Sequence, residues 1–296
     1  MSEGSDQRAR VLCLGDALVD LVCERHVRDV SEAPAFVPHL GGSGAAVAAV
    51  AARAGAPVAL AAAAGDDDWG RWLRARLAGA GVDVSAFALE PGAATPVALV
   101  TVAESGAPSA RVYGEPPVVE IPSPGSALFL TAAGLADSAS REAVMATRAA
   151  ALEAGLPVVF DPGLRGRRWR SQADAAASAN ACVPGALLVR ASAWEAAVMT
   201  GEDDVERAAL ALVKAGARLV VVTLGDEGAI LRGELRADAF GVPAQVVSTL
   251  GAGDVFTGTL LARLALSDFY PPAVAAGLRD AVAAAARACE RWGAVD

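Results

Sequence analysis

Lysine is almost missing from this chain. Of the 25 basic residues only Lys214 is a lysine, and it ends an apolar helical pattern, where a cation near the C-terminus is favourable. A Walker-type nucleotide site needs a Gly-Lys pair, a protein kinase needs a strand lysine and a pyridoxal enzyme needs a Schiff-base lysine. The sequence therefore excludes these three kinds of site. Any phosphate must be bound by backbone N–H groups, arginine and metal.

Signatures of metal binding and secretion are also missing. The four cysteines are widely spaced without a C-x-x-C pair, and the only histidines are His26 and His39, so no zinc cluster is predicted. We find neither a signal-peptide pattern nor an apolar run suited to a membrane span, and we expect the thiols to stay reduced. These observations predict a cytoplasmic protein with no membrane partner.

Acidic residues outnumber basic ones. The 296 residues contain 34 Asp and Glu against 25 Lys and Arg, which gives a net charge of −9. A nucleic-acid partner needs a basic face, so nucleic acid is not expected as a partner. The hydrophobic content of 54% indicates a folded protein with a core of its own. Small molecules are the expected partners.

Short apolar runs alternate with helical patterns along most of the chain, as is typical of parallel strands buried on both faces. We therefore predict an α/β fold with a doubly wound, mostly parallel sheet in a single domain, residues 1–296. Residues 16–22 are expected to continue the first strand, and residues 244–247 to form a strand end. The clearest strand-like runs are residues 10–15, 58–64, 127–130, 157–160, 187–189 and 219–223.

Two segments interrupt this rhythm. Residues 95–101 and 109–113 alternate apolar and polar side chains and read as a hairpin. With the irregular stretch before the first glycine pair, they predict a small β lid over a ligand cleft, formed by residues 21–40 and 93–118. A solvent-facing hairpin is the alternative. If the exposed lid edge pairs with a second chain, a homodimer follows.

A glycine-rich turn at Gly251-Ala252-Gly253-Asp254 precedes an apolar helical pattern. Its glycines permit a tight turn and leave N–H groups unpaired at a helix start, where the helix dipole favours an anion. An acid in such a phosphate cradle makes sense if it accepts the proton of a hydroxyl that attacks the phosphate. Asp254 is therefore the candidate base, with ordinary helix capping as the alternative.

Candidate substrate contacts lie near the first strand. Asp20 alternates with Asp16 near the expected carboxyl end of this strand, where open α/β sheets bind ligands. Asp20 either holds sugar hydroxyls or is an exposed charge at a strand end. Gly41 and Gly42 open an alanine-rich helical pattern, and they either admit a ligand or only permit close packing.

Two arginines are candidates for contact with an anionic substrate. Arg111 lies in the expected lid, and Arg165 follows an Asp-Pro segment. Arginine pairs well with carboxylates and phosphates. A location at the surface, without a ligand, is the commoner fate of an arginine, so both alternatives stay open.

In this order, the segments resemble the ribokinase-like (PfkB) family of carbohydrate kinases, nearest to its fructokinase and 2-keto-3-deoxygluconate kinase branches. The resemblance runs from about residue 11 to about residue 294 and implies that Asp254 is the catalytic base beside an anion hole formed by Gly251, Ala252 and Gly253. It also implies that Asp20 holds the hydroxyls of the sugar. The remaining matches are Gly15, Gly41-Gly42, residues 65–70, 81–83 with Thr95, 161–165 with Trp169, Glu195, and residues 223–225 with Gly228.

The same resemblance implies the nucleotide side and the reaction. Ser192, Thr223, Gly225 and Gly228 are implied nucleotide contacts, and Glu195 is the implied acid that positions magnesium through water. The implied cofactors are ATP and Mg²⁺. The implied activity is transfer of the γ-phosphoryl group to a primary hydroxyl of a small sugar, either fructose-like or a keto-deoxy sugar acid.

Four positions depart from the family pattern. Ala46, Gly163 and Ser192 stand where an asparagine is usual, and Ser248 stands where an aspartate is usual. Ser248 argues against the monovalent-cation site of the family, because a hydroxyl lacks the charge of a carboxylate. The other losses leave two alternatives: a nucleoside or riboside kinase, and a catalytically weak sugar- or nucleotide-binding protein. A dinucleotide oxidoreductase lacks support, because no G-x-G-x-x-G follows the first strand.

Overall fold

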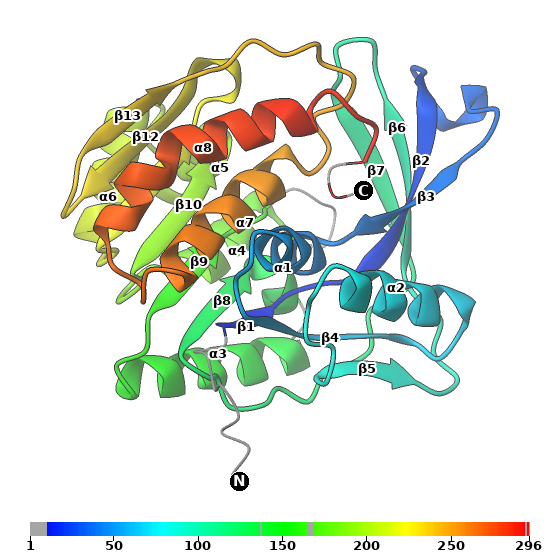
Figure 1. Cartoon of the computed structure of the whole chain (residues 1–296), viewed down its shortest axis with the longest axis horizontal. Helices are drawn as coiled ribbons and strands as arrows, with labels where there is room; N and C mark the ends of the chain where they lie inside the picture. The colour runs from blue at the N-terminus through cyan, green and yellow to red at the C-terminus, as the bar shows by residue number, and fades with distance from the viewer. Residues whose placement is uncertain (1–10, 137, 165–168, 294, 296) are drawn as a thin grey trace, which may run out of the picture.

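The computed structural model describes residues 11–136, 138–164, 169–293 and 295. The predicted substrate contact Arg165 lies outside the described residues. The chain forms a central sheet covered by helices on both faces, with a smaller sheet beside it (Figure 1).

The central sheet has nine strands in the order β13-β12-β11-β10-β9-β8-β1-β4-β5. The strands from β11 to β5 are parallel, and β12 and β13 are antiparallel at one edge. Short apolar runs form these strands because both faces of the sheet are buried. The strands are β1 (Val11–Leu14), β4 (Val58–Gly65), β5 (Phe87–Glu90), β8 (Ala127–Thr131), β9 (Val158–Asp161), β10 (Leu188–Ser192), β11 (Leu219–Thr223), β12 (Gly228–Gly233) and β13 (Ala237–Phe240).

Helices cover both faces of this sheet, so the predicted doubly wound fold is confirmed. Within the described part of the chain, no helix combines the length and apolar character that a bilayer crossing requires. One face carries α1 (Ser43–Arg53), α2 (Asp68–Gly79), α7 (Ala252–Ala265) and α8 (Pro272–Ala288); the other carries α3 (Ser138–Glu153), α4 (Gln172–Asn180), α5 (Ala193–Thr200) and α6 (Val205–Lys214); short 3-10 turns are η1 (Val30–Glu32), η2 (Ala132–Leu135) and η3 (Gly225–Glu227).

Helices α1 and α7 lie in close contact, which brings their N-termini together. A Cβ atom at Gly258 would lie 2.6 Å from the Cβ of Val50 and 2.9 Å from the carbonyl oxygen of Val47. Only glycine allows this separation, because real Cβ atoms do not approach other heavy atoms so closely. The contact therefore fixes the start of α7, which carries Asp254, beside the start of α1.

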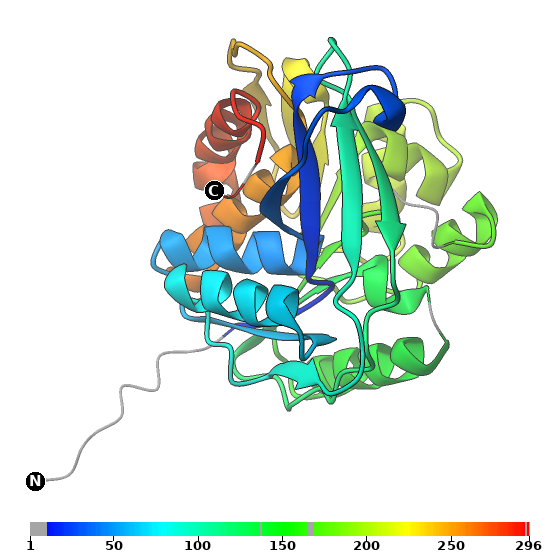
Figure 2. The same cartoon turned by 90° about the vertical axis from the view of Figure 1, so that its right-hand side faces the viewer.

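The smaller sheet has the strand order β3-β2-β6-β7. Both segments expected to form the lid contribute strands to it. One face packs Leu18, Val22, Ala98 and Val100 against Leu250 and Trp292. The sheet lies at the right-hand side of the molecule in Figure 1 and faces the viewer in Figure 2. The strands are β2 (Leu18–His26), β3 (Val37–Gly41), β6 (Val97–Val102) and β7 (Pro108–Tyr113).

Two strand predictions were wrong: residues 16–22 do not continue the first strand, and residues 244–247 do not form a strand end. The first strand ends at Leu14, because a turn at Gly15 packs against Gly44, where an added Cβ would lie 2.6 Å from the Gly44 Cα. The chain then leaves the central sheet and enters β2. Residues 244–247 form no strand, and the N–H groups of Val247 and Ser248 both donate to the carbonyl oxygen of Cys289, at 2.8 and 3.0 Å.

Candidate active site

The glycine-rich turn stands at the start of α7. Gly251 precedes the helix with a φ of 69°, in the left-handed region that favours glycine. The buried Ser248 hydroxyl accepts a hydrogen bond from the N–H of Leu250 at 3.2 Å and holds the start of the turn. The first N–H groups of a helix lack partners within the helix and attract anions. The turn can therefore bind a phosphoryl group.

Asp254 lies in the first turn of this helix. The residue keeps partial access to solvent, but dense surrounding protein desolvates its carboxylate and raises its pKa to about 7. The negative charges of Asp161 and Asp16 raise the pKa further, whereas a hydrogen bond from Ser43 and the charge of Arg190 lower it. A base with a pKa near neutrality can be ionised before the reaction and still hold a proton afterwards.

A buried ion pair lies below the turn. Asp161 ends β9 and Arg190 lies in β10, and their side chains are joined by an Nη1–Oδ2 distance of 3.2 Å. The Thr257 hydroxyl donates to Asp161 Oδ2 at 2.5 Å, and Arg190 Nη2 donates to the Thr223 hydroxyl at 2.9 Å. The network therefore connects α7 to the carboxyl ends of three adjacent strands.

Gly253 lies directly against this arginine. An added Cβ atom at Gly253 would be 2.9 Å from both Nη1 and Nη2 of Arg190. The missing side chain is therefore a requirement of the contact between the turn and the guanidinium, in addition to any approach of a ligand to the backbone.

Asp20 lies on the lid side of the site, in β2. Burial, followed by the charge of Asp16, raises its pKa to about 7, and His39 lowers it. A Cβ atom at Gly41 would lie 2.5 Å from the carboxyl carbon of Asp20, so Gly41 makes room for this carboxylate. Gly42 has a φ of 89°, and its Cβ would collide with the carbonyl oxygen of Asp16. The glycine pair thus fits the backbone against the turn that leads to Asp20.

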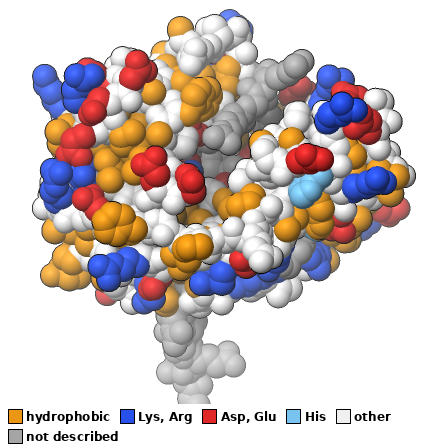
Figure 3. All heavy atoms as spheres, turned by 90° about the horizontal axis from the view of Figure 1, so that it is seen from above, with side chains coloured by type: hydrophobic (Ala, Val, Ile, Leu, Met, Phe, Trp, Pro, Cys, Tyr) orange, Lys and Arg blue, Asp and Glu red, His pale blue; other side chains and the backbone are white. Residues whose placement is uncertain are grey.

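Asp16 connects the two sides of the site. Its charge raises the pKa values of both Asp20 and Asp254, so the three carboxylates are close enough to interact. The surface is hollowed between the part that carries a histidine, which belongs to the smaller sheet, and the larger part of the molecule (Figure 3).

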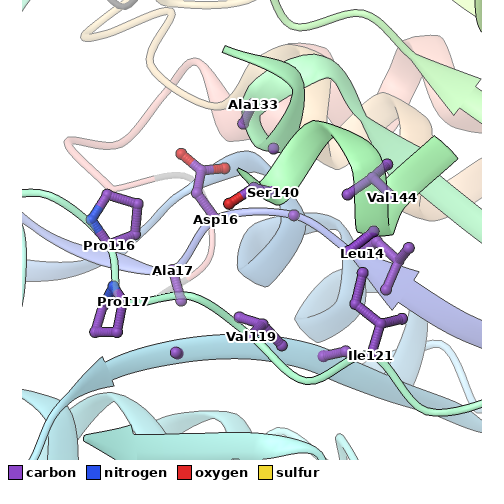
Figure 4. A pocket seen from close by; sticks show the side chains of 15 residues that line it. Leu14, Asp16, Ala17, Pro116, Pro117, Val119, Ile121, Ala133, Ser140 and Val144 are labelled. Carbon is purple, nitrogen blue, oxygen red and sulfur yellow. The ribbon is translucent and has the colours of Figure 1, made fainter. Parts of the chain in front are cut away.

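A mainly apolar pocket opens beside Asp16. It encloses about 570 Å³, its open mouth included. Figure 4 shows the Asp16 carboxylate at one end of the pocket and Leu14, Ile121 and Val144 at the other. The pocket lies at the carboxyl ends of β1 and β8, where the chain turns to opposite faces of the sheet. Open α/β sheets bind ligands at such a switch point.

The expected nucleotide contacts lie near the ends of β10 and β11. Ser192 caps α5, and the Thr223 hydroxyl is occupied by Arg190. Gly225 has a φ of 66° and faces open space. Gly228 has a φ of 109°, and its Cβ would lie 2.0 Å from the carbonyl oxygen of Ala239. The backbone thus explains Gly228 without a ligand, while Gly225 leaves room for one.

Glu195 has a demonstrable structural role. Its Oε2 accepts hydrogen bonds from the backbone and the hydroxyl of Ser192, both at 2.8 Å, and its Oε1 accepts one from the N–H of Leu164 at 2.9 Å. The residue is 4% exposed. Across the described residues, no three His, Cys, Asp or Glu side chains gather as a metal site. A magnesium ion here would depend mainly on phosphates and water for its ligands.

Arg111 does not join these residues, which corrects the expected substrate contact. In the smaller sheet Arg111 is paired with Leu99, and Asp20 is paired with Ala98. Successive side chains of a strand point to opposite faces. The Arg111 side chain therefore lies on the opposite face of the sheet from Asp20, near Arg28 and Asp29.

Three polar residues of the site were not predicted from the sequence: Arg190, Ser43 and Thr257. Asp161 was named only within a segment that resembles the family. Arg190 carried a usable signal, because a charge inside the apolar run of residues 187–191 is unexpected in a buried strand. Ser43 and Thr257 carried none, because hydroxyl residues in helices are common.

Comparison with known proteins agrees with this geometry. The model of the pfkB family carbohydrate kinases matches residues 8–296. Fructokinase-1 of Oryza sativa subsp. japonica is 32% identical over 266 residues, which cover 86% of this chain and 82% of that protein. Aminoimidazole riboside kinase of Salmonella typhimurium is 30% identical over 278 residues, which cover 90% of this chain and 84% of that protein.

Solved structures give the same result. The fructokinase from Vibrio cholerae O395, bound to fructose, ADP and calcium ion, has a TM-score of 0.86 at 28% identity and covers 98% of this chain and 96% of its own. The aminoimidazole riboside kinase from Salmonella enterica, complexed with aminoimidazole riboside and an ATP analog, has a TM-score of 0.84 at 27% identity and covers 97% and 95%. With the family model matched across nearly its whole length, the chain belongs to the pfkB family of carbohydrate kinases.

Proposed function

We propose that the protein is an ATP-dependent sugar kinase that phosphorylates a primary hydroxyl of a small, fructose-like sugar. The observation that carries the proposal is the position of Asp254, a carboxylate with a pKa of about 7 at the glycine-rich start of α7. A base in an anion-binding turn suits an alcohol that attacks a phosphoryl group.

Each residue has a defined task in this reaction. Asp20 accepts hydrogen bonds from sugar hydroxyls and orients the acceptor. Asp254 takes the proton of the attacking sugar hydroxyl. The hydroxyl oxygen bonds to the γ-phosphorus of ATP while the bond from this phosphorus to the β,γ-bridging oxygen breaks, which releases ADP. The N–H groups of Gly251, Ala252 and Gly253 stabilise the charge on the transferred group. Magnesium, when bound, would be held mainly by the phosphates and water, and it would neutralise charge on the phosphates.

Alignment of the reactants and exclusion of water supply the rest of the rate enhancement. Phosphoryl transfer needs little covalent help from the protein, so the rate depends on alignment and fixed dipoles. The sheet of β2, β3, β6 and β7 is the proposed lid, which carries Asp20 and keeps out water that would compete as acceptor.

A riboside kinase is the second candidate, and the pocket beside Asp16 favours it. A free hexose would leave this apolar hollow unfilled, whereas the aglycone of a riboside would bury its surface against Leu14, Val119, Ile121 and Val144. The relative from Salmonella typhimurium is an aminoimidazole riboside kinase, and the similar structure from Salmonella enterica is complexed with aminoimidazole riboside.

A panel of acceptors separates these candidates. Formation of ADP and of phosphorylated product should be measured with fructose, keto-deoxy sugar acids, pentoses, nucleosides and other ribosides. A preference for fructose supports the first candidate and a preference for ribosides the second. Ligand binding without transfer to any acceptor would contradict both and favour a catalytically weak binding protein.

A variant of the pocket sharpens this test. Ala143→Leu places a larger side chain in the pocket, so it should lower turnover of a riboside and leave fructose unaffected. Ala146→Leu, on the exposed side of the same helix, is the matched control and should change neither.

Assembly and compartment also belong to the proposal. Strand β7 is an exposed edge of the smaller sheet, and the partly exposed Val112 and Tyr113 make it suited to pairing with a second chain. A homodimer in light scattering, lost when these two side chains are replaced by lysine, would support pairing through this edge. The cytoplasm is the proposed compartment.

A further inference from the structure

Arg190 is a buried cation beneath the glycine-rich turn. The residue is 8% exposed, and its Nε is buried without a hydrogen-bond partner in the described structure. A buried charge is costly unless it is paired, so the presence of a buried arginine at this place needs an explanation. None of the roles assigned above to the turn, the base or the substrate contacts uses this guanidinium.

The guanidinium is held from three directions. Nη1 contacts the two carboxylate oxygens of Asp161 at 3.2 and 3.5 Å, and Nη2 donates to the Thr223 hydroxyl at 2.9 Å. Its carbon Cζ lies 5.7 Å from the ring centre of Phe256 in α7. With Gly253 against both Nη atoms, the group is fixed between two strands and the first turns of α7.

Three carboxylates interact with Arg190, and they differ in their other partners. Burial opposes its positive charge, but Asp161, Glu195 and Asp254 outweigh burial and raise its pKa. Asp161 also receives the hydroxyl of Thr257, and Glu195 is occupied by Leu164 and Ser192.

Asp254 also lies within the electrostatic reach of Arg190. It faces Ser43 from α1 and the repulsive charges of Asp161 and Asp16 from the strand side. Within the described part of the chain, Arg190 is the cation that opposes these charges at Asp254.

We propose that Arg190 is a positioning residue for phosphoryl transfer, which supports the turn through Gly253 and stabilises the charged form of Asp254. This inference rests on the proposed function. The planar fork of arginine suits the task, since it reaches Asp161 and Thr223 at once, whereas a lysine is a single point charge. The base thus obtains its cation from below, leaving the solvent side of the turn open to the phosphoryl group.

The test compares Arg190→Gln and Arg190→Lys with Arg148→Gln. Arg148 is a matched control: it is 7% exposed, and its guanidinium donates to the carbonyl oxygens of Cys182 and Pro184. The titration of Asp254 is followed by carboxyl carbon NMR, and its signal is assigned by its loss in Asp254→Asn. The pH profile of kcat/KM is measured on the same proteins with the acceptor chosen from the panel.

Arg190→Gln should raise the pKa of Asp254 by about 1 unit or more, as removal of an adjacent opposite charge does. The acidic limb of the kcat/KM profile should move by the same amount, so that activity recovers toward high pH. Arg148→Gln should lower the melting temperature but shift neither the pKa of Asp254 nor the acidic limb of the kcat/KM profile. An unchanged titration in folded Arg190→Gln, or a uniform loss of activity at every pH, would overturn the proposal.

Arg190→Lys decides the matter if Arg190→Gln does not fold. The lysine keeps the charge, so Asp254 should titrate within about half a unit of the wild type. Loss of the fork should lower kcat/KM about 10-fold. A kcat/KM equal to that of the wild type would overturn the positioning role. The NMR titration needs no turnover, so a shifted Asp254 in a protein that phosphorylates nothing would refute the proposed function and leave the effect of Arg190 standing.

Discussion

Replacing Gly253 by alanine tests the contact between the turn and Arg190 with a single methyl group. Gly253 has an ordinary helical backbone, since it lies in α7 and its φ is not positive. Alanine is the better helix former by about 1 kcal/mol, so helix propensity alone predicts a more stable protein. The added Cβ would lie 2.9 Å from Nη1 and Nη2 of Arg190, which is too close.

The expected cost follows from what the arginine would lose. The guanidinium would have to move away from Asp161 and Thr223, to which it is bound at 3.2 and 2.9 Å. Breaking a buried ion pair outright costs about 3–5 kcal/mol. A partial displacement, offset by the gain in helix propensity, should lower the free energy of unfolding by about 1–3 kcal/mol. The melting temperature should then fall by about 2 °C per kcal/mol.

Thermal unfolding and steady-state kinetics measure the two consequences. Turnover should fall about 100-fold, because a small misplacement of catalytic groups has an effect of this size. Gly79→Ala is the matched control: Gly79 ends α2 and a Cβ there meets nothing within 4 Å, so this variant should be as active as the wild type and at least as stable. A Gly253→Ala protein with unchanged stability and turnover would refute the reasoning.

The other predictions concern the two carboxylates with raised pKa values. Asp20→Asn should raise the KM for the acceptor about 10-fold with little change in ATP affinity, as expected for a lost charge-assisted hydrogen bond. Asp29→Asn, at an exposed helix cap in the lid, is the control. Equal effects of the two variants would contradict the assignment of Asp20 as the sugar contact. Asp20 and Asp254 both have folded pKa values of about 7 against 3.8 in the unfolded chain, so the folded protein binds more protons between these values. The free energy of unfolding should therefore fall as pH rises from about 4 to about 7. Denaturant titrations across this range should show that fall, and the Asp254→Asn variant should show a smaller one. A free energy of unfolding that rises with pH, and does so equally in Asp20→Asn and Asp254→Asn, would contradict the two pKa values.

Much of the fold was predictable from local patterns. Strands such as β4 and β11 are short apolar runs, as is typical of strands buried on both faces. The break after Leu14 was not predictable, because residues 18–22 alternate just as a continued strand would. Contact between Gly15 and Gly44, distant in the sequence, decides that the chain changes sheets.

The site was predictable where one segment carries the chemistry. The turn of residues 251–254 is local, so its position at a helix start could be read directly. The face on which Arg111 lies depends on the pairing of the three strands β2, β6 and β7, which alternation within one strand does not determine. The Arg190 network joins residues from β9, β10, β11 and α7, and only the packed fold brings them together.

Asp254→Asn, assayed with the acceptor that the wild type phosphorylates best, tests the central claim most directly. Turnover should fall at least about 1,000-fold, since an essential base is lost, and ATP binding measured by calorimetry should be retained. The variant should also melt at a higher temperature than the wild type above about pH 7, because it removes a desolvated charge that faces Asp161 and Asp16. Near-normal turnover by Asp254→Asn would contradict the assignment of Asp254 as the base.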